Sequence, residues 1–349
     1  MKTQPNEATE ISIELVKDDD RPLLEVENLH VEFRTREGIA HAVNGVSYSV
    51  AAGETLAVLG ESGSGKSVTA QAIMGILDTP PGFVTGGQVR FRGEDVLPMP
   101  EEDRRKLRGA HMAMIFQDAL SALNPVFTVG WQIGEMFRVH QGMSRKDAKI
   151  KAIELMDRVR IPSAKERVND FPHQFSGGMR QRVMIAMSIA LNPSLLIADE
   201  PTTALDVTVQ AQVMDLLAEL QRESGMGLIL ITHDLGVVAD VADKCAVMYA
   251  GRIVEEAPVE DLYGRPAHPY TEGLLGSIPR LDQKGQDISV IKGLPPTLTR
   301  LPSGCSFHPR CPRMRDRCKT DVPPLYDVAP DRGSACHYWE EVLGERTGT

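Results

Sequence analysis

Apolar residues alternate or cluster along this chain in a way that predicts several strands. Residues 23–33 alternate and predict a half-buried strand, whereas residues 55–60 form a short apolar run typical of a strand buried on both faces. A helix is expected to follow at Ser67. Residues 195–199 and 227–233 are further apolar runs, each preceded by a stretch with helical periodicity. Parallel strands joined by crossover helices produce this pattern, so the sequence predicts an α/β fold.

The periodicity changes twice in the rest of the chain. Between residues 131 and 159 apolar residues recur at helical spacing, which predicts a helical subdomain over about residues 119–190. After about residue 265 proline becomes frequent, and long regular elements are not expected. The predicted parts are a disordered lead over 1–22, an α/β domain over 23–258 and a small irregular C-terminal extension over 259–349.

Composition and charge exclude several classes of protein. The 349 residues carry a formal net charge of -10. A nucleic-acid partner is not expected, because binding to the phosphate backbone favours basic domains. No apolar run approaches the roughly 20 residues that span a bilayer, and the first ten residues lack the basic and apolar regions of a secretion signal. We expect a chain that is neither secreted nor integral to a membrane.

The clearest chemical motif is GESGSGKS at residues 60–67, between the predicted buried strand and the predicted helix. It matches the P-loop pattern, in which glycines allow backbone amides to surround phosphate groups. We expect Lys66 to reach the β- and γ-phosphate oxygens and the Ser67 hydroxyl to hold Mg²⁺. The predicted ATP-binding residues of this segment are Gly60, Ser62, Gly63, Gly65, Lys66, Ser67 and Val68.

Two carboxylates follow the apolar run at residues 195–199. Asp199 ends the run and Glu200 comes next, so both are expected at the carboxyl edge of the sheet, where α/β folds bind ligands. Asp199 is placed to hold Mg²⁺, and Glu200 to polarise an attacking water molecule. A solvated turn is the alternative, because Asp-Glu-Pro is common at strand ends.

Further motifs in a fixed order make residues 23–258 resemble the ATP-binding-cassette superfamily. IFQD around Gln117 is similar to the family's Q-loop, FSGGMRQR from Phe175 to its signature motif, and ITHD around His233 to its switch segment. The resemblance implies a P-loop ATP-binding-cassette fold and ATPase activity with ATP and Mg²⁺. It implies catalytic roles for Gln117 and His233 beside Glu200, with Gln117 also a magnesium ligand.

Two more residues receive a role only from this resemblance. Asp206 is similar to the aspartate of the family's D-loop, and Phe33 occupies the position of the aromatic residue that stacks on adenine. For Phe33, packing in the core is the alternative, because an aromatic residue at the end of an alternating strand often packs there. For Gln117, the alternative is a surface turn before Asp118.

The signature motif predicts a partner. Ser176, Gly177 and Gly178 are expected to open a helix, which gives an anion site far in sequence from the P-loop. In the family two cassettes pair head to tail, so the resemblance implies that these residues contact ATP bound by a second cassette. Met179 stands where glutamine is usual, but this position does not face phosphate. A monomer is therefore expected to hydrolyse ATP poorly.

The end of the chain resembles the C-terminal region of oligopeptide and dipeptide importer ATPases. HPYT at residues 268–271, GLPP at 293–296 and the run from Cys305 to Cys311 carry this resemblance. It implies a subunit that energises import of dipeptides or oligopeptides, with nickel, glutathione or another small solute as alternatives. The implied partners are a second, non-identical ATPase subunit, two membrane permeases and, indirectly, an extracytoplasmic solute-binding protein. The implied location is the cytoplasmic face of the inner membrane, as a peripheral subunit.

Four cysteines lie in this proline-rich extension, namely Cys305, Cys311, Cys318 and Cys336. A metal centre would stabilise a segment that is poor in apolar residues, and four thiolates suit a [4Fe–4S] cluster or zinc, with free thiols as a third possibility. Relatives with an iron–sulfur cluster at this place favour the cluster. His308 and His337 could replace a ligand in a zinc site, although surface positions are expected for both.

Three further expectations concern residues outside these motifs. The arginines and lysines between residues 310 and 319 are expected on a solvated face, or at a membrane or partner contact. Cys245 lies in an apolar run and is expected in the core. The ATP site is expected to be complete without the extension.

Two functions of other classes are alternatives to a transporter ATPase. A soluble cassette ATPase acting on ribosomes or DNA usually has two cassettes or long coiled-coil arms, and neither is visible in this sequence. An iron–sulfur protein with an inactive P-loop would not be an enzyme, yet Lys66, Asp199, Glu200 and His233 are all intact.

Overall fold

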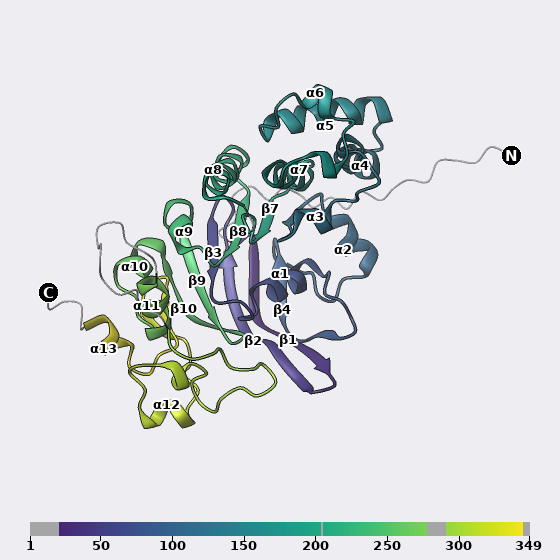
Figure 1. Ribbon diagram of the computed structural model, residues 1–349. Coiled ribbons are helices and arrows are strands. Elements are labelled where there is room, and N and C mark those ends of the chain that lie inside the picture. The colour runs from purple at the N-terminus through teal and green to yellow at the C-terminus, as the bar shows by residue number, and fades with distance from the viewer. Residues whose placement is uncertain (1–20, 204, 278–290, 345–349) are drawn as a thin grey trace.

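The computed structural model describes residues 21–203, 205–277 and 291–344, and two β-sheets form its centre (Figure 1). The predicted lead at residues 1–22 lies almost entirely outside the described residues. The smaller sheet contains β1 (Leu24–Thr35), β2 (Gly38–Val50), β4 (Gly82–Phe91) and β5 (Glu94–Asp95). Its order is β2-β1-β4-β5 with antiparallel pairing. The half-buried strand predicted at residues 23–33 is confirmed as β1.

The larger sheet has eight strands and carries the predicted parallel core. The strands are β3 (Thr55–Leu59), β6 (Met112–Ile115), β7 (Leu195–Asp199), β8 (Gly227–Thr232), β9 (Lys244–Tyr249), β10 (Arg252–Pro258), β11 (Tyr326–Ala329) and β12 (Arg332–Ser334). Their order is β11-β12-β10-β9-β3-β8-β7-β6. The five strands from β9 to β6 are parallel, whereas β10, β12 and β11 pair antiparallel. The α/β prediction is confirmed.

Alternate residues of the parallel strands pack on opposite faces of the larger sheet. On β7, Leu196 and Ala198 belong to the core that also contains helical residues such as Val183 and Leu217. Leu195 and Ile197 belong to a second core shared with β1, β2 and β4. These strands are therefore buried on both faces, which explains their continuous apolar runs.

Helices cover both faces of the larger sheet and form a separate group at one end. The helices α1 (Lys66–Met74) and α2 (Glu101–Leu107) lie on the side of the smaller sheet, and α8 (Val207–Ser224) and α9 (Leu235–Val241) on the other (Figure 1). The group between β6 and β7 in the chain comprises α3 (Ala119–Ala122), α4 (Val129–Gln141), α5 (Arg145–Arg158), α6 (Ala164–Arg167), η1 (Pro172–Gln174) and α7 (Gly177–Ile189). The helical periodicity predicted between residues 131 and 159 corresponds to α4 and α5. No helix among the described residues is long and apolar enough to cross a membrane.

The described residues after 258, here called the tail, contain short elements only. These are α10 (Val259–Gly264), α11 (Pro269–Gly276), η2 (His308–Arg310), α12 (Asp316–Thr320), β11, β12 and α13 (Trp339–Gly344). In Figure 1 the tail lies on the side of the larger sheet away from the group α3 to α7. Strand β12 joins the larger sheet through β10, where Glu255 pairs with Ser334.

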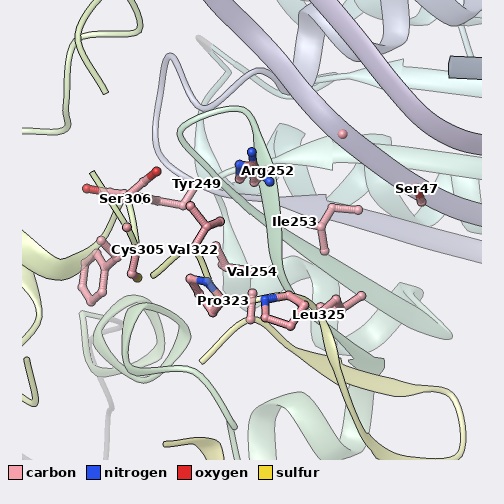
Figure 2. Close-up of a pocket in the computed structure, with 15 residues that line it drawn as sticks. Ser47, Tyr249, Arg252, Ile253, Val254, Cys305, Ser306, Val322, Pro323 and Leu325 are labelled. Atoms are coloured by element: carbon pink, nitrogen blue, oxygen red, sulfur yellow. The ribbon is translucent and has the colours of Figure 1, made fainter. Parts of the chain in front are cut away.

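The tail also shares its core with the rest of the chain. The ring of Phe307 is 2% exposed and lies 5.2 Å from that of Tyr249 on β9 and 5.3 Å from that of Tyr270 on α11. A cavity of about 170 Å³ lies between the tail and the larger sheet. It is lined by tail residues such as Val322 and by Ile253 of β10 (Figure 2). The tail therefore closes part of the core beside the larger sheet, and the expected completeness of the ATP site without the tail stays a prediction.

Candidate active site

Four predicted site segments follow four neighbouring parallel strands. The P-loop follows β3 and His233 follows β8. Asp199 ends β7 with Glu200 directly after it, and Gln117 comes two residues after β6. Since these strands are adjacent and parallel in the order β3-β8-β7-β6, their carboxyl ends meet at one edge. This is the edge at which α/β sheets bind ligands. The topology thus brings together residues up to 173 positions apart in sequence, from Gly60 to His233.

Two P-loop positions require glycine because neighbouring strands pack closely against the loop. Gly60 has φ 147° and Gly65 has φ 107°, in the region that favours glycine. A Cβ at Gly60 would lie 2.3 Å from the carbonyl oxygen of Met248, and one at Gly65 would lie 2.3 Å from that of Ala42. Glycine at these two positions is thus explained by the packing of strands against the loop, and not only by room for phosphate.

The Lys66 side chain points back along the loop. Its Nζ donates to the carbonyl oxygens of Gly60 at 2.8 Å and Glu61 at 3.0 Å. Burial lowers the pKa of Lys66, and the carboxylates of Glu200, Asp199 and Glu61 oppose this shift. A cation held between acidic groups and an open loop is placed to receive a polyphosphate.

Ser67 and Asp199 lie together, as the sequence predicts for a magnesium site. The Ser67 hydroxyl donates to Oδ1 of Asp199 at 2.9 Å. Burial raises the pKa of Asp199, and the hydrogen bond from Ser67 opposes this shift. A hydroxyl and a carboxylate are the oxygen ligands that Mg²⁺ prefers, and a bound cation would favour the ionised carboxylate. These two residues fit the ion by chemistry and by position.

Glu200 lies at the centre of a polar group. Its Oε2 accepts from Nε2 of Gln117 at 2.8 Å and from the hydroxyl of Thr203 at 2.8 Å, and its Oε1 lies 3.4 Å from Nδ1 of His233. The backbone of Glu200 has φ 46°, which is uncommon outside glycine, and its N–H donates to the carbonyl oxygen of Ile231 at 2.8 Å. Gln117 and His233 thus both meet the carboxylate that was predicted to polarise water.

The signature residues start a helix at the surface. Ser176 is the N-cap of α7, where its hydroxyl accepts from the N–H of Met179 at 3.3 Å, and Ser176 and Gly177 are both exposed. A Cβ at Gly178 would lie 2.4 Å from Val209 on α8. Asp206 caps α8 by accepting from the N–H of Val209 at 3.0 Å. The signature and the D-loop therefore belong to one packed pair of helices.

Two predicted ATP-binding residues lie against the core. Phe33, near the end of β1, and Val68, on α1, are half-buried and pack against the core shared with the smaller sheet. This position agrees with the alternative of core packing for Phe33. Stacking of Phe33 on adenine stays a prediction.

The four tail cysteines line one cavity of about 20 Å³. Burial raises the pKa of Cys311 to about 11 and that of Cys336 to about 12, and raises that of Cys305 as well. Among the described residues, no group of three or more histidine, cysteine, aspartate or glutamate side chains is placed to hold a metal ion. The thiols therefore share a cavity without the geometry of an ion site.

The polar residues around this cavity have protein partners. Nδ1 of His308 lies 2.9 Å from the carbonyl oxygen of Cys305, and Nδ1 of His337 lies 2.9 Å from the hydroxyl of Tyr326. The basic residues form ion pairs, which are Arg310 with Glu61, Arg313 with Glu272, Arg315 with Glu341, Arg317 with Asp321 and Lys319 with Asp316. Most of these pairs are exposed or half-buried, but the Arg310 side chain is only 5% exposed. The expectation of a solvated face is wrong for this one residue.

Two residues at the site, Thr203 and Glu61, have no role predicted from the sequence. Thr203 reaches Glu200 from three positions away, a spacing that a turn after the Asp-Glu-Pro segment could have suggested. Glu61 lies inside the P-loop, but its partner Arg310 is 249 residues away. No local pattern in the sequence predicts that contact.

Comparisons with known proteins agree with this geometry. The family model "ABC transporter" matches residues 43–203, and the model "Oligopeptide/dipeptide transporter, C-terminal region" matches residues 254–318. The chain is 51% identical to the oligopeptide transport ATP-binding protein OppD of Salmonella typhimurium, over 90% of this chain and 93% of that protein. It is 50% identical to the dipeptide transport ATP-binding protein DppD of Bacillus subtilis, over 86% of this chain and 90% of that protein.

Solved structures show the same fold. A dimeric ATP-binding cassette in a post-hydrolysis state, bound to ADP and Pi, matches with a TM-score of 0.61 and 26% identity. The match covers 68% of this chain and 98% of that cassette.

Proposed function

This chain belongs to the ABC transporter family, in its branch of oligopeptide and dipeptide importer ATPases. We propose that ATP hydrolysis at the sheet edge that carries the P-loop drives peptide import. It is the ATP-binding and ATP-hydrolysing subunit of a peptide importer. The observation that supports the site best is the meeting of the P-loop, Asp199, Glu200, Gln117 and His233 at the carboxyl ends of four adjacent strands.

The proposed roles follow from the contacts of each side chain. Lys66 binds the β- and γ-phosphates, and Ser67 and Asp199 hold Mg²⁺, with Gln117 completing its shell from the edge of the site. Mg²⁺ neutralises phosphate charge when it is bound. Glu200 orients and polarises the attacking water, because its carboxylate is held by Gln117 and Thr203. His233, exposed beside Glu200, contacts the γ-phosphate.

The exposed signature supports a second cassette as partner, with its ATP closed by Ser176, Gly177 and Gly178. The related cassette of known structure is a dimer with ADP and Pi bound. We propose pairing with a non-identical ATPase subunit, in which Asp206 faces the junction between the two sites. Each composite site would then use one chain's P-loop and the other chain's signature.

Replacing the signature serine tests this pairing. Ser176→Ala should lower hydrolysis at the partner's P-loop by about tenfold or more, because an anion contact is lost, while ATP affinity at Lys66 stays near wild type. Turnover at the partner's P-loop is measured in a complex in which Lys66 of this chain is replaced. ATP affinity at Lys66 is measured separately, with Lys66 intact. Ser144→Ala is the matched control, since Ser144 also caps an exposed helix, α5, by accepting from a backbone N–H. Full activity of the purified chain as a monomer would contradict the pairing.

Exposed apolar residues beside Gln117 support contact with a membrane permease. Phe116, Leu120, Val126 and Phe127 are 38–70% exposed and follow one another between β6 and α4. Apolar side chains gathered in one exposed segment mark an interaction surface. We propose two permease subunits as the occupants, with a solute-binding protein acting on their outer side. The chain then lies at the cytoplasmic face of the membrane as a peripheral subunit.

We further propose that the four tail thiols hold a [4Fe–4S] cluster with a structural role. They line one cavity, and a cluster of four irons separates its thiolates more widely than a single ion does. Binding would release the thiol protons, against burial that raises the pKa of Cys311 and Cys336 further above neutral pH. ATP hydrolysis needs no electron, so the cluster would contribute stability to the tail and no redox step.

Anaerobically purified protein should contain about four irons per chain and absorb broadly near about 400 nm. Cys311→Ser should bleach this absorption and make the tail sensitive to protease. Cys245→Ala is the control, because Cys245 is buried on β9 and does not line the cavity. Stoichiometric zinc without iron would contradict the cluster. Wild-type tail stability in a metal-free variant lacking all four thiols would contradict the structural role.

Copurification from membranes tests the system type. The tagged chain should bring two permeases and a second cassette with it. Ribosomes or DNA in their place would support a cassette ATPase of the other class.

A further inference from the structure

Glu61, the second residue of the P-loop, is held by two residues of the tail. Its carboxylate accepts from both terminal nitrogens of Arg310, Nη1 to Oε2 at 2.6 Å and Nη2 to Oε1 at 2.9 Å. Its backbone N–H donates to the hydroxyl of Tyr270 at 2.9 Å. A bidentate guanidinium–carboxylate pair fixes orientation as well as distance. The flank of the nucleotide loop is therefore anchored in a segment that contains none of the nucleotide motifs.

The residues that hold Glu61 are buried and well fixed. The guanidinium of Arg310 lies 5.9 Å from the ring centre of Tyr249, and its Nε donates to the carbonyl oxygen of Lys292 at 3.3 Å. Tyr270 is 0% exposed, and its ring lies 4.6 Å from that of Tyr249. The Arg310 side chain is 5% exposed and that of Glu61 28% exposed, so this ion pair is less screened than the exposed pairs of the tail.

The HPY segment explains how Tyr270 reaches the loop. His268 is buried and caps α11, where its Nδ1 accepts from the N–H of Tyr270 at 3.0 Å. Pro269 occupies the first helical position, which suits its fixed backbone angle. These two residues set the direction of the helix start and aim the Tyr270 hydroxyl at the N–H of Glu61.

The same P-loop residue contacts Lys66. The carbonyl oxygen of Glu61 accepts from Nζ of Lys66 at 3.0 Å. Arg310 holds the side chain of Glu61, and Tyr270 holds its N–H. Lys66 thus lies against a residue that the tail fixes before phosphate binds. We propose that Arg310 and Tyr270 are positioning residues that keep the P-loop and Lys66 in the geometry that accepts ATP. This inference rests on the proposed nucleotide site.

The position of Arg310 in the tail makes the ATP site depend on tail folding. Arg310 ends η2, between Cys305 and Cys311, both of which line the thiol cavity. The turn is tied to α12 by a hydrogen bond from the N–H of Cys305 to the carbonyl oxygen of Cys318 at 2.9 Å. Any change that unfolds the thiol-lined segment withdraws the guanidinium from Glu61.

The test compares ATP binding and turnover in variants of this contact within the full chain. Arg310→Ala should raise the Kd for Mg-ATP at least about tenfold, since a shift of about 1 Å in a binding loop has effects of this size or larger. Arg310→Lys keeps the charge but loses the fork, and Tyr270→Phe keeps the ring but loses the acceptor, so each should raise Kd about threefold. Arg315→Ala is the control, because Arg315 makes an exposed ion pair with Glu341 in the same segment.

Further measurements separate positioning from stability. Exchanging the charges in a Glu61→Arg, Arg310→Glu double variant should recover part of the affinity lost in either single variant. Thermal unfolding without nucleotide shows which variants are folded. Wild-type Kd in folded Arg310→Lys and Tyr270→Phe, or a lower unfolding temperature with unchanged Kd, would overturn the proposal. Lys66→Ala tests the nucleotide site separately: lost binding there with normal Arg310 variants would defeat the positioning role alone.

Discussion

Glu200→Gln should reduce steady-state ATP turnover of the assembled complex at least about 10²-fold while ATP still binds. The amide has the same shape, so the contacts with Gln117 and Thr203 can be kept in part. It cannot accept a proton from water, however, and it lacks the charge that polarises the nucleophile. Binding is expected to persist because Glu200 does not contact the P-loop backbone that holds the phosphates. The measurement is phosphate release at saturating Mg-ATP, together with the Kd.

Glu219→Gln is the matched control for this change. Glu219 is a half-exposed carboxylate on α8 that pairs with Arg160, far in the fold from the carboxyl edge. Its turnover should equal that of wild type. Turnover of Glu200→Gln near wild type would remove Glu200 from the water-activating role.

Lys66→Ala should weaken ATP binding itself by about 30-fold or more. Hydrogen bonds to charged groups contribute up to about 3 kcal/mol, and about 2 kcal/mol corresponds to that factor. The loss is expected because the negative charges of Glu200, Asp199 and Glu61 act on the Lys66 site, and without the lysine charge they repel the phosphates. Calorimetric titration with Mg-ATP measures the effect.

Lys106→Ala provides the comparison, since Lys106 makes an exposed ion pair with Asp103 on α2. It should bind ATP as wild type does. A Kd for Lys66→Ala within about threefold of wild type would exclude Lys66 from phosphate binding.

Much of the larger sheet could be predicted because its strands are buried on both faces. The run from Leu195 to Asp199 and the run before the P-loop are short, apolar and followed by chemistry-bearing residues, which indicates parallel strands directly. If parallel strands are neighbours, their carboxyl ends lie at the same edge of the sheet. The sequence therefore indicated which residues meet at the site, while the order β3-β8-β7-β6 required the structure.

The tail could not be predicted in the same way, because its contacts span long separations. Strand β12 joins β10 across about 80 positions, and Arg310 meets Glu61 across 249. Neither contact leaves a periodic pattern in the sequence. For this reason the sequence does not indicate that Arg310 meets the P-loop, and the independence of the ATP site from the tail stays a prediction. The role of Phe33 could not be predicted for another reason. A half-buried aromatic residue can pack in the core and can also stack on adenine, so its position agrees with both interpretations.

Peptide uptake into sealed vesicles tests the central claim most directly. The vesicles would contain the chain with its second cassette and permeases, oriented with the cassettes outside, and the solute-binding protein and labelled peptide inside. Transport is then followed as ATP-dependent movement of peptide to the cassette side. We expect movement that requires Mg-ATP and is abolished by Glu200→Gln but not by Glu219→Gln. Peptide movement at the wild-type rate in the Glu200→Gln complex, or without ATP, would contradict the claim that this site drives import.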